Sequence, residues 1–253
     1  MTYEAKIGRW LFAAACVGFG VEGLIFTKFI GGLEPRLSTL LPALPWAWVN
    51  GGVLIVAGLS LLSGRTARAG ALFLAAMFAL ATAVLQTPLM LASLKNAADD
   101  FFHVVAIAAG ALALAVSVGR PDALGAWPAR GALAARMVFG VCTIGHGVMH
   151  FVFFRFTADF IPAWIPGHDF WAAATGAAQI AAGLAILSGV LGRLAATLTG
   201  AMYASWFFLV HIGRVMAQPQ STQEWNSLAI VAALSASALL VAGLLAREPR
   251  PSA

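Results

Sequence analysis

Charged residues are scarce in this sequence. Asp, Glu, Lys and Arg make up 10% of its 253 residues, whereas hydrophobic residues make up 61%. Because a soluble domain carries roughly a quarter charged residues, a chain of this composition cannot cover a surface that faces water. The shortage of charge therefore argues against the common classes of soluble enzyme and favours a protein embedded in a lipid bilayer.

Cysteines and the glycine signatures of soluble enzymes are scarce or missing as well. The two cysteines, Cys16 and Cys142, both fall inside apolar runs, so the sequence predicts no disulfide framework. The sequence has no phosphate-binding loop, nucleophile elbow, CxxC pair or dinucleotide-binding glycine pattern. The apolar runs also lack the alternation of a transmembrane β-barrel, so we expect an all-α polytopic membrane protein.

Long apolar runs are what the sequence has in abundance. A run of about 20 apolar residues can cross a bilayer as a single helix. Glycine, proline and charged residues divide this chain into eight such runs. We therefore expect eight transmembrane helices, near residues 8–28, 46–63, 68–91, 101–118, 133–154, 170–188, 191–214 and 226–246.

The two halves of the chain resemble each other. Residues 9–29 align with residues 136–156 without a gap, and the match continues to the pair Met77 and Met202. We interpret this as a tandem duplication of a four-helix unit. Because four is an even number, both copies enter and leave the membrane on the same side, which makes the repeats parallel. The predicted repeats are residues 1–126 and 127–253.

The basic residues predict an orientation. The net charge is +5, and in a membrane protein such an excess marks the cytoplasmic loops; we expect no nucleic-acid partner. The side that holds both termini carries twice as many basic residues as the other, so we expect both termini in the cytoplasm and the chain in the inner membrane. The ten on that side are Lys6, Arg9, Arg65, Arg68, Arg120, Arg130, Arg136, Arg193, Arg247 and Arg250, and the five opposite are Lys28, Arg36, Lys95, Arg155 and Arg214.

All five histidines fall on the outer side of this topology. His146 and His150 are spaced i and i+4, so they share one face of an expected membrane helix. A polar or ionisable group that faces lipid costs a few kcal/mol, so both rings should point into the bundle and meet a polar partner. Glu22 and His211 lie at matching depth and are the expected partners. The candidate ligand-binding residues are His146, His150, His211, Glu22, Tyr203 and Arg214.

The histidine pair is compatible with three cofactors. Two histidines at this spacing can bind one metal ion, which makes His146 and His150 the candidate metal ligands. Gly145 and Gly147 could leave open space for a haem beside an axial histidine, and a quinone needs only a hydrogen-bond donor and an aromatic slot. His103 and the acids before it, in contrast, are interpreted as an ordinary helix start, and His168 as a solvated loop residue.

The second half carries a distinctive series of residues, namely His150, Phe151, Pro162, Pro166, Trp171, Gly176, Ala182, Gly183, Leu184 and Arg193. In these residues it resembles the DoxX-like membrane proteins. The resemblance implies a redox-linked role beside other membrane redox subunits, and it supplies no catalytic residues. Members are typically one four-helix unit, so this chain resembles a duplicated form, with Phe19 and Gly23 in place of the two histidines in the first half.

We therefore expect a redox-linked membrane component with a histidine-containing site in the outer half of the bilayer. A small-solute transporter is the first alternative, since parallel repeats suit transporters. A non-catalytic scaffold subunit of a membrane complex is the second. Lipid is the expected surrounding in each case, and a homo-oligomer is compatible with all three.

Overall fold

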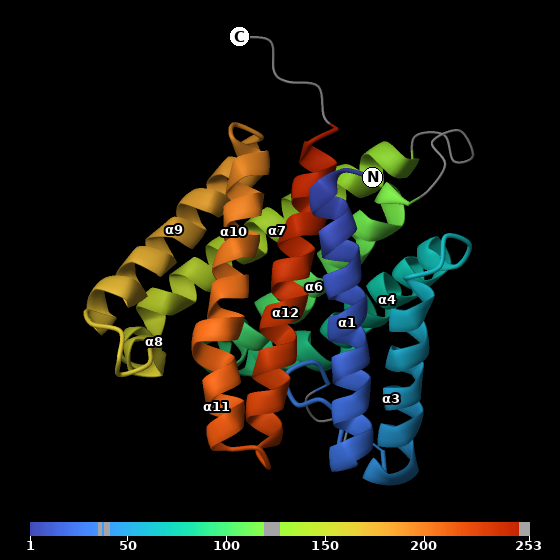
Figure 1. The fold of residues 1–253 in the computed structure, drawn as a ribbon, viewed down its shortest axis with the longest axis horizontal. Coiled ribbons are helices and arrows are strands. Elements are labelled where there is room, and N and C mark those ends of the chain that lie inside the picture. The colour runs from blue at the N-terminus through green and yellow to red at the C-terminus, as the bar shows by residue number, and fades with distance from the viewer. Residues whose placement is uncertain (35–36, 38–40, 119–126, 248–253) are drawn as a thin grey trace.

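The computed structural model describes residues 1–34, 37, 41–118 and 127–247 and is a bundle of helices (Figure 1). These residues contain no strand, so the all-α prediction is confirmed for them. The helices are α1 Tyr3–Phe26, α3 Ala43–Ser60, α4 Ala67–Ala81, η1 Thr82–Gln86, α5 Thr87–Ala92, α6 Leu94–Ser117, α7 Trp127–Val152, α8 Phe154–Phe160, α9 His168–Ser188, α10 Gly192–Trp206, η3 Phe207–His211, α11 Ile212–Ala217 and α12 Thr222–Leu245.

Seven helices of the described residues are long and apolar enough to cross a membrane. Two of them are compound, because α4, η1 and α5 form one continuous helix and α10, η3 and α11 form another. The apolar part of α3, Leu44–Ser60, is shorter than these seven. The multi-pass class is therefore supported, and seven helices rather than the expected eight have the length of a span.

Some helix bounds differ from those expected. The helix expected at 133–154 begins earlier, at Trp127, and ends at Val152. The segment between the expected spans 133–154 and 170–188 contains a further short helix, α8. The expected spans 68–91 and 191–214 each contain a π-helical turn, η1 and η3. Hydropathy detects a span but not its backbone hydrogen-bond pattern, so these turns could not be read from apolar periodicity.

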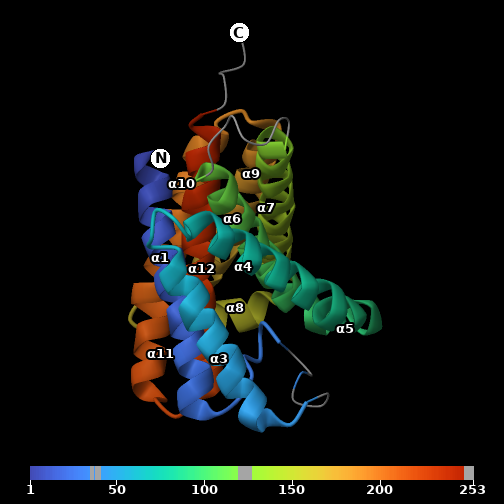
Figure 2. The same cartoon turned by 90° about the vertical axis from the view of Figure 1, so that its right-hand side faces the viewer.

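The bundle is held together by contacts between its halves. α1 packs along α12, α6 packs along α7, and α6 also contacts α12. Figure 2 shows α6 and α12 behind the outer layer of α3 and α4. The first residues of α1 and the last residues of α12 lie at the same end of the bundle (Figure 1). Large apolar side chains such as Phe73, Leu80 and Leu91 are exposed, as a lipid-facing surface requires.

Corresponding positions of the two halves make matching contacts. The Arg9 guanidinium donates to the carbonyl of Leu61, and the Arg136 guanidinium donates to that of Ile186 at 2.8 Å. Each arginine thereby ties the first helix of its half to the end of the second.

The helix crossings match as well. A Cβ at Gly20 would lie 2.5 Å from the carbonyl oxygen of Gly51, and one at Gly147 would lie 2.6 Å from that of Gly176. Both crossings therefore depend on glycine for their close approach. The π-helical turns also fall at matching places, since Thr82 and Phe207 each begin one.

The orientation prediction rests partly on residues outside the structure. Of the fifteen basic residues counted for it, Arg36, Arg120 and Arg250 lie outside the described residues. Residues 119–126, where the boundary between the predicted repeats falls, lie outside them too.

Candidate functional site

His146 lies inside the bundle, on α7. Its side chain is only 4% exposed, and its Nδ1 lies 2.9 Å from the Tyr203 hydroxyl on α10. The prediction that this ring turns inward and meets a polar group from another helix is confirmed. The partner is Tyr203, however, and not Glu22 or His211. Tyr203 is 2% exposed, so both groups of this hydrogen bond are shielded from solvent and lipid.

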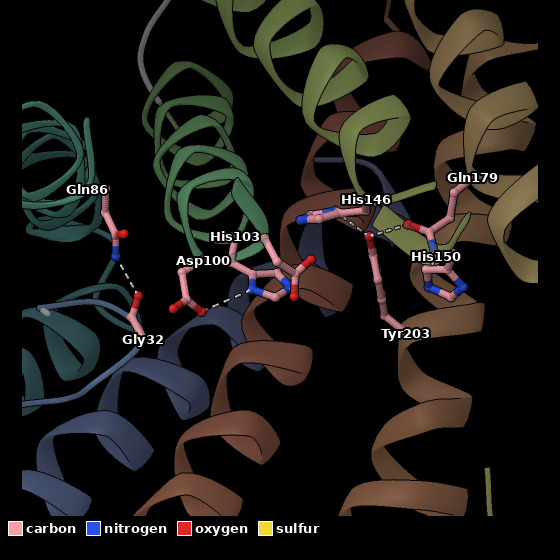
Figure 3. A network of polar contacts seen from close by, with 9 residues as sticks. Gly32, Gln86, Asp100, His103, His146, His150, Gln179 and Tyr203 are labelled. Carbon is pink, nitrogen blue, oxygen red and sulfur yellow. Dashed lines mark hydrogen bonds and ion pairs between the residues drawn. The ribbon is translucent and has the colours of Figure 1, made fainter. Parts of the chain in front are cut away.

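The hydrogen bonds continue from Tyr203 to the second histidine (Figure 3). The Tyr203 hydroxyl donates to Gln179 Oε1 at 3.3 Å, and Gln179 Nε2 lies 3.1 Å from His150 Nε2. The other ring nitrogen of His150 lies 3.2 Å from Thr175 Oγ1 and 3.3 Å from the carbonyl oxygen of Ala172. We call His146, Tyr203, Gln179 and His150 the polar network; it joins α7, α9 and α10.

The donors and acceptors of the polar network fix where the protons sit. Because the Tyr203 hydroxyl donates to Gln179, it must accept from His146, which places the imidazole proton on Nδ1. Because the Gln179 amide donates to His150 Nε2, the proton of His150 is also on Nδ1. Both nitrogens of His150 are thus engaged, whereas the lone pair of His146 Nε2 is left over.

His103 faces the free side of His146 (Figure 3). The centres of the two rings lie 4.7 Å apart, and His146 Nε2 has no hydrogen-bond partner. Two carboxylates on α6 flank His103, with Asp99 4.0 Å from its Nε2 and Asp100 3.9 Å from its Nδ1. One donor atom each of Asp99, His103 and His146 lies within 4.8 Å of the others.

The interpretation of His103 and its acids as a helix start is wrong. Helix α6 begins at Leu94, and no acidic residue lies in its first turn. Asp99 and Asp100 therefore sit inside the helix, one turn before His103. A sequence signal for this existed, because carboxylates three and four residues before a histidine share its helix face.

Gln179 is the other member of the site that the sequence did not reveal. It is 1% exposed and is an isolated amide in the apolar run of α9. A buried amide must find hydrogen-bond partners, and that requirement was the available signal. Its partners lie on α7 and α10, however, and no spacing along one helix indicates them.

Aromatic rings enclose the polar network. His150 stacks on Trp206 with ring centres 5.4 Å apart, and the Tyr203 ring meets Trp206 edge to face at 5.4 Å. The space expected beside the glycines for a haem is filled. A Cβ at Gly145 would lie 2.7 Å from the Phe102 ring, and the backbone of α9 lies beside Gly147. These positions cannot accommodate a macrocycle without rearrangement.

The remaining predicted residues lie away from the polar network. Arg214 makes a two-pronged ion pair with the buried Glu224, at 2.8 and 2.7 Å, and its guanidinium carbon lies 3.8 Å from the centre of the Phe160 ring. His211 contacts Phe160, and its Nδ1 has no hydrogen-bond partner. Glu22 is buried on α1 with one unpartnered carboxylate oxygen.

An open cavity of about 470 Å³ lies between α8, the segment that follows it and α11. Its lining includes Phe160, Trp164, His168, Val210 and Arg214. Tyr203 lies on the same continuous helix as Val210, two turns earlier, or about 10 Å along the axis. The cavity and the polar network are therefore neighbours along one helix.

A family model described as a domain of unknown function (DUF8561) matches residues 139–246. This range covers less than half of the chain and contains the whole polar network, but not Asp99 or His103. No curated protein and no solved structure matches the chain.

Proposed function

We propose that this chain is a redox-linked component of the inner membrane that binds a membrane quinone at its outer face. One juxtaposition carries the proposal: an open cavity with aromatic and N–H-bearing walls lies two helical turns from a buried network of imidazoles and a phenol. The resemblance to DoxX-like proteins supports the same role.

The cavity has the chemistry that a quinone head group needs. Its volume lies within the range of small-molecule sites. Phe160 and Trp164 offer flat apolar faces, while His168 and Arg214 carry N–H groups for the quinone oxygens. Arg214 has more N–H groups than the two that Glu224 receives.

The first half of the chain supports a functional role for the polar network. In the alignment of the halves, His146, Gln179 and Tyr203 correspond to Phe19, Leu54 and Phe78. These three are among the largest fully buried side chains of the structure. Since apolar residues fill the same places in one half, packing does not require the polar residues of the other.

The membrane arrangement is part of the proposal. We propose eight transmembrane helices, with α3 as the short one, arranged as two parallel four-helix repeats with both termini in the cytoplasm. The matching arginine, glycine and π-helix positions of the two halves support the repeats. A quinone-binding component must exchange electrons with another redox group, so we propose other membrane redox subunits as partners.

Titration of the purified full-length protein with decylubiquinone, followed by calorimetry, tests quinone binding. We expect saturable binding, weakened about 5-fold by Trp164→Ala, since an aromatic contact is worth on the order of 1 kcal/mol. Trp46→Ala is the matched control, because Trp46 is an exposed tryptophan beside the corresponding link of the first half. Absence of saturable binding, or an equal loss in both variants, would refute the proposal.

A further inference from the structure

We infer that Asp99, His103 and His146 form a binding site for one divalent first-row transition-metal ion. The inference deepens the proposed function by naming the inorganic group held beside the polar network, and it rests on that function for the role of the ion. The binding itself is argued from the geometry of the three side chains.

The donor set suits such an ion. Two imidazoles and one carboxylate are the protein ligands of many zinc and non-haem iron sites that keep positions open for other ligands. The three donor atoms already lie within 4.8 Å of one another. Ligands of one ion are roughly 3 to 3.5 Å apart, given metal–ligand bonds of about 2.0 to 2.2 Å. The half-exposed Asp99 side chain, at 51%, has room to make this adjustment.

An unpartnered buried nitrogen points into the cluster. His146 is 4% exposed, its Nδ1 binds Tyr203, and its Nε2 has no hydrogen-bond partner. The proton arrangement of the polar network leaves a lone pair on that Nε2, which is the form that binds a metal. A buried nitrogen without a partner destabilises the fold, and a metal ion would remove this cost.

One of the two histidines has the second partner that metal-ligating histidines use. Asp100 lies 3.9 Å from Nδ1 of His103, which is too far for a hydrogen bond, and Asp99 lies 4.0 Å from its Nε2. Tyr203 holds Nδ1 of His146. Such a partner fixes the orientation of the His146 ring and raises the basicity of its other nitrogen.

The structure favours this trio over the pair His146 and His150. Both nitrogens of His150 are engaged, one by Gln179 and the other by Thr175 and Ala172. Binding a metal through His150 would require breaking one of these contacts. His103 is 20% exposed and lies directly against the free side of His146.

Cobalt(II) titration of the chelator-treated full-length protein in detergent tests the inference, with visible absorption as the readout and zinc(II) as competitor. We expect one cobalt ion per chain. Loss of an outer partner of a metal site costs about 10- to 100-fold in affinity, so Asp99→Asn and His103→Gln should each weaken binding by about 100-fold or more. Asp169→Asn is the matched control for Asp99→Asn, because Asp169 is 62% exposed and pairs with Arg155, and it should leave the cobalt affinity unchanged. Thermal unfolding without metal checks that each variant is folded.

Three outcomes would overturn the inference. The first is the absence of saturable cobalt binding. The second is cobalt binding that survives both Asp99→Asn and His103→Gln. The third is cobalt binding that is abolished by His150→Gln but retained in His103→Gln. The titration contains no quinone, so its failure is independent of decylubiquinone binding. Metal binding without quinone binding would in turn refute only the proposed function.

Discussion

His146 connects the two parts of the candidate site. Its ring joins two polar groups of different character: the buried polar network through Nδ1 and the carboxylate-flanked His103 on its other face. The corresponding residue of the first half is Phe19, which is fully buried. Keeping an imidazole with one unpartnered nitrogen at such a place costs stability, so the residue is better explained by ligand binding than by packing.

The Tyr203 hydroxyl should contribute measurably to stability. Tyr203→Phe removes the acceptor of His146 and the donor to Gln179, leaving two buried polar groups without partners. We expect a loss of about 1 to 3 kcal/mol in the free energy of unfolding, measured by denaturation in detergent. Tyr3→Phe is the control, because Tyr3 is 77% exposed. Equal stability of the two variants would contradict the network.

Glu34 should make stability depend on pH. Burial raises the pKa of its carboxyl from 4.5 to about 7, although Ile30 N–H and the Asn50 amide donate to it. Between these values the folded protein keeps a proton that the unfolded chain has lost, so stability falls as pH rises from about 4.5 to about 7 and then levels off. In Glu34→Gln this fall should be smaller by about 1 to 3 kcal/mol. A wild type that gained stability relative to the variant over this range would contradict the assignment.

At the residue scale the sequence predicted groups within one helix better than groups between helices. The shared inward face of His146 and His150 follows from their spacing, and hydrocarbon excludes the other orientation. The choice of Tyr203 over Glu22 as partner could not be predicted, because it depends on which helices become neighbours. Asp99 and His103 were underestimated because acids near an expected helix start have an ordinary explanation.

At the scale of single helices, glycines set how closely the first two helices of each half approach. Gly20 meets the backbone of α3, whereas Gly18, on the same helix, has no atom near its missing Cβ. Gly20→Ala should therefore destabilise the fold by about 1 to 3 kcal/mol. Gly18→Ala should be neutral or slightly stabilising, since alanine favours helix. Thermal unfolding of both variants tests this, and a more harmful Gly18→Ala would show that the crossing is placed wrongly.

Exchange of the polar network for its first-half counterparts separates stability from function. The triple variant His146→Phe, Gln179→Leu, Tyr203→Phe replaces all partners together by apolar groups, which can be nearly neutral for stability. We expect a folded protein, monodisperse in size-exclusion chromatography, whose cobalt affinity is at least about 100-fold lower. An unfolded variant would mean that the network is needed for folding.

Helix positions were predicted more reliably than helix details. Eight apolar runs each have a helical counterpart in the structure, because hydrophobic length alone determines a span. The kinked entry of α3, where Leu44 is non-helical, and the separate helix α8 were not predicted. Both features depend on local backbone hydrogen bonds near proline-containing links, to which hydropathy is insensitive.

For the whole molecule, the two halves of the sequence differ in polarity, because the second half contains the polar network and the first has buried apolar residues at the aligned positions. α1 packs on α12 and α6 packs on α7, so each half completes the packing of the other. His103 comes from the last helix of the first half and His146 from the first helix of the second. The candidate metal site therefore lies across the junction of the halves, and neither half contains it alone.

The topology of the whole chain gives the final prediction. The eight proposed spans would place both termini on one side, and the ten-to-five distribution of basic residues predicts that this side is cytoplasmic. Seven spans would place the termini on opposite sides, so the experiment also decides whether α3 crosses the membrane. We expect a fluorescent reporter that matures only in the cytoplasm to be active when fused to either terminus.

A reporter that requires the outer compartment should be inactive at the same two positions and active when inserted in the outer link after α8. The arrangement of charge explains why this outcome is expected. Arg9 and Arg136 bind carbonyls at the end of the next helix, at the end of the bundle that we propose to face the cytoplasm. The inverted orientation would place both guanidinium groups on the outer side, against the usual distribution of basic residues. Activity of the cytoplasmic reporter at only one terminus would leave α3 on one side of the membrane and end the parallel-repeat topology.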